Sequence, residues 1–215
     1  FRRVLFRSDL LIQTMRRVSG EGGEPVIDLL TNFGGGKTHS MIALYHLASG
    51  VAVGKLGDVG NLLKTAEVEL PKKIARAVLV GQMISPSSPK LREPGVVTHT
   101  LWGDLAYQLA GRDGYELLRS DDEAGTNPGE KLIELFKMAG PSVILIDEWV
   151  AYARQLPART DEPRMCGGDF DTQFTFEKNA FGDPPGSMLL FALRVDTNKV
   201  PSEVKHAQQI GRAHV

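Results

Sequence analysis

The fold is decided by the stretch Val26-Ile-Asp-Leu-Leu-Thr-Asn-Phe-Gly-Gly-Gly-Lys-Thr38. Its apolar start at residues 26–30 predicts a buried strand, and the glycines at residues 34–36 follow closely. Residues 37–49 then carry apolar side chains at helical spacing until Gly50 ends the helix. A glycine loop between a strand and a helix is the setting of a phosphate-binding loop. The stretch therefore predicts an α/β fold with an anion site where the helix begins.

The loop residues predict a nucleotide site with an associated Mg²⁺ ion. Backbone N–H groups that curl around a phosphate need glycine, and the helix N-terminus adds positive partial charge. Lys37 would reach the β- and γ-phosphates, and the Thr38 hydroxyl would bind Mg²⁺. Thr31 stands where the usual pattern has glycine, which restricts the loop entrance but removes no phosphate-binding group. The expected nucleotide-binding residues are Phe33, Gly34, Gly35, Gly36, Lys37, Thr38 and His39.

An acidic pair, Asp147-Glu148, follows the apolar run Ser142-Val-Ile-Leu-Ile146, which predicts another buried strand, the third along the chain. Ligands of parallel sheets bind at the carboxyl ends of the strands, so this pair is expected beside the phosphate loop. Asp147 would hold Mg²⁺ through water or through Thr38, and Glu148 would polarise the attacking water. Lys37 and Glu148 are the expected catalytic residues. As an alternative, Glu148 would serve only the dipole of a helix that begins there.

With both motifs placed, the chain resembles the additional-strand, catalytic-glutamate class of P-loop ATPases and, within it, the AAA-like group. It is also similar to a family of large bacterial and archaeal ATP-binding proteins, catalogued as a domain of unknown function and often found in phage-defence neighbourhoods. The resemblance covers residues 18–196. The stretches that carry it are Phe33-Gly-Gly-Gly-Lys-Thr-His39, Ala43-Leu-Tyr-His-Leu47, Thr100-Leu-Trp-Gly-Asp-Leu-Ala-Tyr-Gln-Leu109 and Asp147-Glu-Trp-Val-Ala-Tyr-Ala-Arg154.

The resemblance implies a P-loop NTPase three-layer α/β/α sandwich, with a mostly parallel sheet of order 5-1-4-3-2. It implies ATP binding and hydrolysis, and it does not supply the molecule on which the ATPase acts. With the Mg²⁺ ion expected at Thr38 and Asp147, ATP and Mg²⁺ are the expected ligands, and we expect a homo-oligomer in the full-length protein. Relatives of this fold place a polar sensor residue after the fourth strand, which corresponds here to the apolar run at residues 187–193 and ends with the apolar Ala192 and Leu193. Arg194, Thr197 or Asn198 would have to take that role.

The remaining pattern supplies the other expected elements. Apolar runs predict strands at residues 75–80 and 187–193, and alternation with helices predicts a parallel sheet covered on both faces. Helices are expected at about residues 61–66, 98–109, 130–139, 149–156 and 170–181, and a loop at residues 81–94. In the helix expected at residues 98–109, Trp102 and Tyr107 are expected in the core rather than on a stacking surface.

Composition excludes several classes of protein. Lys plus Arg number 25 and Asp plus Glu 26, which argues against attachment to nucleic acid or membrane mainly by charge. The longest apolar runs are far shorter than the roughly 18 residues of a membrane-spanning helix. One cysteine, Cys166, excludes an internal disulfide and is typical of a reducing cytoplasm, where we expect the protein.

The two ends of the chain read as one DNA string in opposite orientations. Residues 1–8 back-translate to TTC AGA CGT GTG CTC TTC CGA TCT, and the reverse complement of that string encodes residues 210–215 and a stop. We therefore interpret both ends as a sequencing-adapter artefact and residues 9–209 as a P-loop ATPase domain truncated at both ends. The fifth strand is expected after residue 209. The alternative is a basic amphipathic arm at the N-terminus.

Three functions remain open from the sequence. An ATPase that drives rearrangement of attached domains fits both motifs, and the acidic pair disfavours a small-molecule kinase, in which activated water would waste ATP. A nucleotide-binding scaffold without turnover is the third.

The histidines show no metal spacing. Arg154, Arg159 and Arg164 fit a lid, a finger reaching a neighbouring subunit or plain surface charge.

Overall fold

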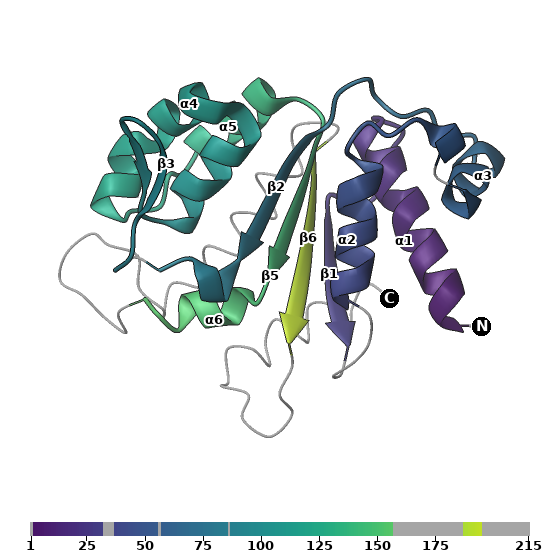
Figure 1. Cartoon of the computed structure of the whole chain (residues 1–215), viewed down its shortest axis with the longest axis horizontal. Helices are drawn as coiled ribbons and strands as arrows, with labels where there is room; N and C mark the ends of the chain where they lie inside the picture. Colours follow the sequence, from purple (N-terminus) through teal and green to yellow (C-terminus); the bar gives the residue numbers. More distant parts are fainter. Residues whose placement is uncertain (1, 32–36, 56, 86, 157–186, 195–215) are drawn as a thin grey trace.

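The computed structural model describes residues 2–31, 37–55, 57–85, 87–156 and 187–194. A four-stranded sheet of order β1-β6-β5-β2 lies at its centre, and every neighbouring pair is parallel (Figure 1). The strands are β1 (Val26–Thr31), β2 (Ala75–Val80), β5 (Ser142–Asp147) and β6 (Ser187–Arg194). All four predicted strands are thus confirmed. Their order is the 1-4-3-2 part of the order that the resemblance implies, while the expected fifth strand falls outside the described residues.

The sheet separates two apolar clusters, because side chains alternate between the faces of a strand. In β5, Val143 and Leu145 belong to one cluster, and Ile144 and Ile146 belong to the other. All four side chains are at most 2% exposed. A strand that is buried on both faces reads as a continuous apolar run, which is why the sequence revealed this one so clearly.

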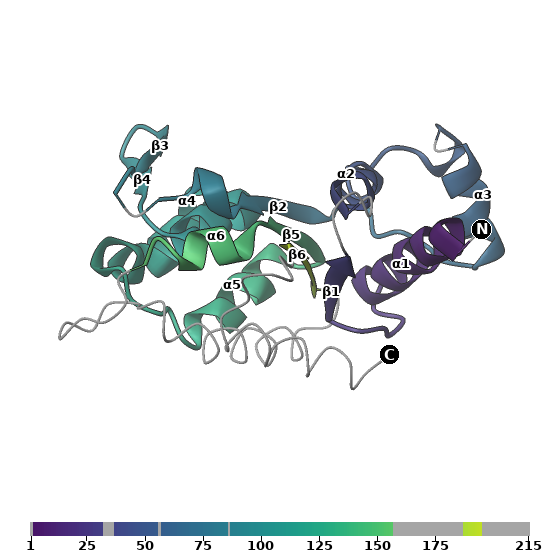
Figure 2. The same ribbon diagram turned by 90° about the horizontal axis from the view of Figure 1, so that it is seen from below.

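One face of the sheet is covered by α1 (Arg2–Val18) and α2 (Lys37–Leu47) (Figures 1 and 2). A short 3-10 helix at Val53–Lys55 leads to α3 (Asp58–Thr65), which packs against α1. Apolar side chains of these helices form one cluster with Leu29, Val143 and Leu145 of the sheet. The buried helical residues include Leu10, Met15, Met41, Leu44, Leu47 and Leu63. The expected helices at residues 37–49 and 61–66 are confirmed, with ends shifted by a few residues.

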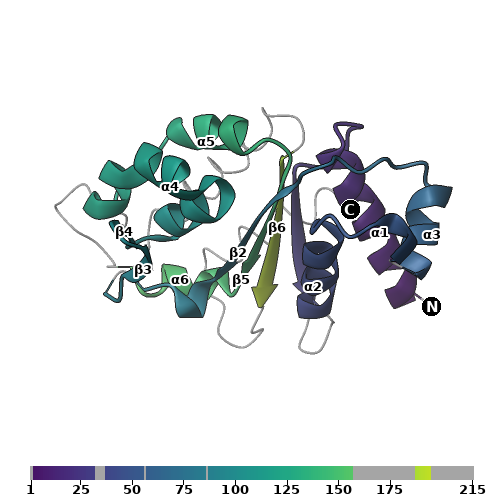
Figure 3. The ribbon, with the colours of Figure 1, turned by 45° about the horizontal axis from the view of Figure 1, so that its top comes forward.

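The other face is covered by α4 (Leu101–Ala124), α5 (Lys131–Ala139) and α6 (Trp149–Ala153) (Figure 3). Their cluster meets Ala77, Leu79, Ile144 and Ile146 of the sheet. Trp102 is 2% exposed and lies in this cluster, as expected, whereas Tyr107 is half-buried. Helices therefore cover both faces, and the described part of the chain has three layers.

The helix predicted at residues 98–109 is only the first half of α4. At Ala110 and Gly111 the backbone leaves helical geometry, and Gly111 takes a φ of 64° that favours glycine. The second half folds back against the first: a Cβ on Gly114 would lie 2.5 Å from the carbonyl oxygen of Ala106. Sequence reasoning missed this helical hairpin and placed the start of the helix at Thr98, which belongs to a strand instead.

Asp122, at the end of this hairpin, holds the beginning of α4 in place. Its carboxylate accepts hydrogen bonds from the backbone N–H of His99 at 2.9 Å, the N–H of Thr100 at 2.8 Å and the Thr100 hydroxyl at 2.6 Å. The His99 ring nitrogen Nδ1 lies 3.1 Å away. Asp122 is 1% exposed, so these bonds replace its contacts with water.

Replacing Asp122 with alanine is expected to lower the free energy of unfolding by about 2 kcal/mol, because buried donors lose a charged acceptor. Chemical denaturation measures the change. The matched control is Asp113→Ala on the same helix, where the aspartate is exposed and the change should stay within about 0.5 kcal/mol. Equal effects of the two substitutions would contradict the role of Asp122.

Residues 81–94 were expected to form a loop, and this prediction is wrong. They contain a 3-10 helix (Gly81–Met83) and β3 (Lys90–Glu93), which pairs with β4 (Val96–Thr98) as an antiparallel hairpin. Gly95 forms the turn with a φ of 84°. Side chains from the second half of α4 fix the hairpin: Arg112 donates to the carbonyl of Pro94 at 2.6 Å, and the Tyr115 hydroxyl donates to that of Val97 at 2.6 Å.

One side chain occupies the outer edge of β2 at Val78. The Gln108 amide accepts a hydrogen bond from the N–H of Val78 and donates to its carbonyl, each at 2.9 Å, as a neighbouring strand would. An edge strand blunted in this way is protected from pairing with another chain.

The other expected helices are α5 and α6, both confirmed, and the one at residues 170–181, which lies outside the described residues. Within the described part of the chain, we find no helix with the length and apolar character needed to cross a bilayer.

Candidate functional site

The expected phosphate loop connects β1 to α2. β1 ends at Thr31 and α2 begins at Lys37, both at the lower edge of the sheet in Figure 1, where the strands end. Lys37 is half-buried, and Thr38 and His39 are exposed in the first turn of α2. The rest of the expected loop, residues 32–36 with Phe33 and the three glycines, lies outside the described residues.

Asp147 lies at this same edge, at the end of β5. Strand alternation places its side chain on the face of Val143 and Leu145, which is the face that α2 covers. Asp147 and Leu29 are both in register with Ala192 of β6, so their Cα atoms lie about 10 Å apart, two strand spacings. The structure therefore brings the expected metal ligand to the side of the sheet on which α2 begins.

Glu148 leaves the strand in an unusual backbone conformation. Its φ is 55°, in the left-handed region that non-glycine residues seldom adopt. Its N–H donates to Oδ1 of Asp147 at 3.0 Å. Such a conformation costs about 1–3 kcal/mol and is found preferentially at functional sites. Asp147 still follows the alternation of strand side chains between the two faces of the sheet, whereas the half-buried Glu148 side chain no longer does.

Gly81 makes room for this turn. Val80 is in register with Asp147, so Gly81 comes level with Glu148. A Cβ on Gly81 would overlap the carbonyl oxygen of Glu148 and lie 3.1 Å from the N atom of Tyr152. Only glycine lets the end of β2 approach the Glu148 peptide so closely.

Replacing Gly81 with alanine is expected to lower the free energy of unfolding by about 1–3 kcal/mol, because backbone atoms rather than a flexible side chain meet the added methyl group. Thermal or chemical unfolding measures this loss. Gly54→Ala is the matched control, since a Cβ there meets nothing within 4 Å. If Gly81→Ala were as harmless as the control, the close approach at Glu148 would be refuted.

The short helix α6 follows Glu148 and is anchored in the core. Trp149 and Tyr152 are each 1% exposed. The Trp149 ring meets Trp102 of α4 edge-on, with ring centroids 6.3 Å apart, and the Tyr152 hydroxyl accepts the N–H of Leu101 at 3.3 Å. The peptide after Asp147 is therefore held between the end of β2 and the beginning of α4.

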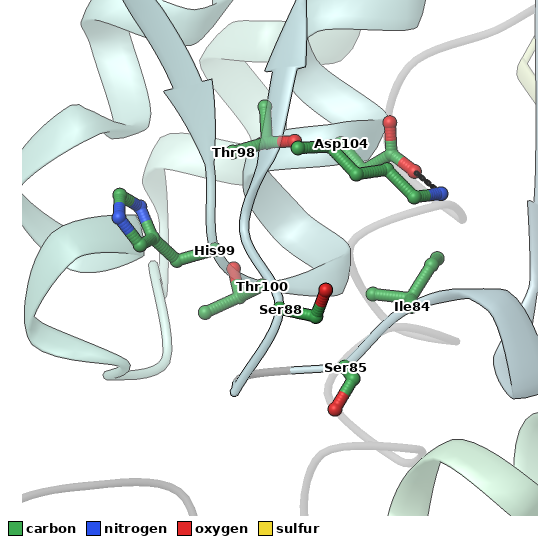
Figure 4. Close-up of a pocket in the computed structure, with 8 residues that line it drawn as sticks. Ile84, Ser85, Ser88, Thr98, His99, Thr100 and Asp104 are labelled. Carbon is green, nitrogen blue, oxygen red and sulfur yellow. Dashed lines mark ion pairs between the residues drawn. The ribbon is translucent and has the colours of Figure 1, made fainter.

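A second polar cluster lies beyond the end of β2, where a small depression is lined by Ile84, Ser85, Ser88, Lys90, Thr98, His99, Thr100 and Asp104 (Figure 4). Asp104 is 2% exposed; Arg92 forms an ion pair with it, and the Lys90 ammonium lies 3.8 Å away. Burial lowers the pKa of Lys90 from its usual value, and the neighbouring Arg92 charge lowers that pKa further. In Figure 4, His99 points away from Asp104. The cluster neutralises a buried carboxylate and fastens the β3–β4 hairpin to α4.

The expected arginine and sensor positions are only partly described. Arg194 is the last residue of β6 and is in register with Thr31, between the strands that carry the loop and the acidic pair. Arg154 is exposed just after α6. Arg159, Arg164, Thr197 and Asn198 lie outside the described residues. Among the residues that the structure does describe, no group of three or more His, Cys, Asp or Glu side chains is placed to hold a metal ion.

Comparison with known proteins identifies a protein family that this chain matches. Residues 4–171 match the DUF499 N-terminal domain, a domain of unknown function, over well more than half of the chain. The chain belongs to the DUF499 family. No curated protein and no solved structure matches it significantly. The DUF499 match includes the start of α2 and the Asp147-Glu148 pair, and it agrees with the resemblance to a domain-of-unknown-function family drawn from the sequence.

Sequence reasoning missed two residues that lie near the acidic pair, Gly81 and Gln155. Gly81 was assigned to a loop because serines and prolines follow it, although a glycine directly after a buried strand is a signal of close backbone approach. Gln155 lies beside Gly81 in space, and no sequence signal distinguishes it from other surface glutamines.

Proposed function

We propose that this DUF499 domain is a P-loop ATPase domain that binds Mg-ATP between β1 and α2 and hydrolyses it with Glu148. The observation that carries the proposal is the position of Asp147, at the carboxyl end of β5 and on the face of the sheet covered by α2. The strand order β1-β6-β5-β2 supports it, because it matches four strands of the expected P-loop sandwich.

The side chains at this edge fit the proposed ligand. Mg²⁺ prefers oxygen ligands and keeps several waters, and the Thr38 hydroxyl and Asp147 carboxylate supply such oxygens from α2 and β5. The N–H groups in the first turn of α2 favour a phosphate, and Lys37 adds a full positive charge. Phe33, Gly34, Gly35, Gly36 and His39 complete the proposed nucleotide-binding set.

Each side chain then has a defined task in hydrolysis. The Lys37 ammonium donates to β- and γ-phosphate oxygens and steadies the charge that develops on them. The Glu148 carboxylate accepts a proton from a water molecule while the oxygen of that water attacks the γ-phosphorus. The bond from the γ-phosphorus to the β–γ bridging oxygen breaks, which releases ADP. When bound, Mg²⁺ neutralises phosphate charge. In the full-length protein, we expect this cycle to rearrange attached domains, within a homo-oligomer in the cytoplasm.

The test is phosphate release from Mg-ATP with no acceptor added, together with nucleotide binding measured by fluorescence or calorimetry. An ATPase binds Mg-ATP and releases phosphate. Binding without release would favour the nucleotide-binding scaffold, and phosphate transfer that needs an added acceptor would favour the kinase. Absence of nucleotide binding would refute the phosphate loop itself.

A further inference from the structure

Gln155 joins the end of β2 to the helix that follows Glu148. Its side-chain amide donates to the carbonyl oxygen of Gly81 at 3.0 Å and to that of Ala151 at 3.2 Å. Ala151 in turn donates its N–H to the carbonyl of Glu148 at 2.9 Å. Both hydrogens of one amide group are thus used to link two backbone segments that pack against the same peptide.

This link acts on the peptide whose conformation is unusual. Gly81 lies level with Glu148 and so close to its carbonyl that no Cβ fits between them. The left-handed φ of Glu148 persists only while neighbouring structure enforces it. If the end of β2 moved away from α6, Glu148 could relax to an ordinary backbone conformation, and its side chain would leave the backbone in a different direction.

We propose that Gln155 is a positioning residue for Glu148, holding Gly81 against the Glu148 peptide so that the carboxylate is aimed at the attacking water. This inference rests on the proposed ATPase function and names a residue through which Glu148 acts. A displacement of about 1 Å in a catalytic group can lower a rate by about a hundredfold. Loss of a hydrogen bond that holds Glu148 in position is therefore sufficient to slow hydrolysis, although Gln155 touches no reacting atom.

Gln155 is not needed to pack the core or to anchor α6. The side chain is exposed, and α6 is already attached to α4 through Trp149 and the Tyr152 hydroxyl. What Gln155 adds is a connection on the opposite side, to β2, and this is the side on which Gly81 meets Glu148.

The experiment is single-turnover hydrolysis of Mg-ATP by Gln155→Leu, with the 215-residue chain in excess over ATP. Leucine has a similar size and no donor. We expect the rate to fall about tenfold to a hundredfold, while the Kd for Mg-ATP stays within about twofold of the parent value. Gln108→Leu is the matched control, since it removes an amide bound to the backbone of the same strand at Val78, and its rate should stay within about twofold.

A double-mutant cycle with Glu148→Gln identifies the route of the effect. If Gln155 acts through Glu148, Gln155→Leu has no further effect once Glu148 is replaced. An equal slowing in both backgrounds, or an unchanged rate in the single variant, overturns the inference and leaves the ATPase proposal standing. If Glu148→Gln itself does not slow the parent chain, the proposed function fails, and the role of Gln155 fails with it.

Discussion

Replacing Lys37 with alanine is expected to abolish Mg-ATP binding, with affinity lowered at least about a hundredfold. Lys37 is the first residue of α2, at the sheet edge where β1 ends, and it is half-buried there. In the proposed site its ammonium is the side-chain cation that bonds the β- and γ-phosphates, and charge-assisted bonds are roughly twice as strong as neutral ones. Losing two of them removes much of the affinity that the phosphates contribute.

Titration with a fluorescent ATP analogue, or calorimetry, measures this loss. Lys64→Ala is the control, because Lys64 is an exposed lysine in the last turn of α3 and should leave the affinity within about twofold. Both variants should unfold within about 1 kcal/mol of the parent chain, so that a loss of affinity reports on the site. A Lys37→Ala chain with the parent affinity would refute the phosphate-loop assignment.

The sheet could be predicted from sequence because burial leaves a strong pattern there. A strand covered on both faces carries apolar residues at every position, as β5 does from Val143 to Ile146. The order of the strands came from the resemblance and not from the pattern. Parallel strands are joined through helices, so chain order alone does not fix their neighbours.

The β3–β4 hairpin and the second half of α4 were missed for different reasons. The Pro94-Gly95 turn lies between two short strands and is a recognisable signal, but serines and prolines before it suggested an irregular loop. The bend at Gly111 depends on what the second half packs against. Asp122 reaches Thr100 only after the hairpin has closed, and no sequence period encodes a contact across 22 residues.

The position of Asp147 was predictable from the sequence, whereas the backbone conformation of Glu148 was not. A carboxylate directly after a buried strand is expected at the carboxyl edge of a parallel sheet, and Asp147 lies at that edge. The positive φ of Glu148 was not foreseen, because the sequence does not show that Gly81, at the end of the neighbouring strand, lies against the Glu148 carbonyl. The sequence therefore predicts where Asp147 lies, and tertiary contacts determine the backbone conformation of the residue that follows it.

Replacing Glu148 with glutamine is expected to preserve Mg-ATP binding and to lower turnover by about a hundredfold or more, the usual effect of losing a general base. Glutamine keeps the size of the side chain and can still orient water, but it accepts no proton at neutral pH. Asp147, on the α2 face of the sheet, is unchanged, so the proposed metal site remains. A retained Kd with a lost rate separates a catalytic role from a binding role.

Phosphate release and nucleotide titration on the same preparation provide both quantities. Glu134→Gln on α5 is the control, because Glu134 is exposed on the helix that covers the opposite face of the sheet. If Glu148→Gln turned over as fast as this control, Glu148 would be only an acid at the start of α6, interacting with the helix dipole. The left-handed conformation would then serve the packing of α6 against β2, and the general base would have to be sought elsewhere.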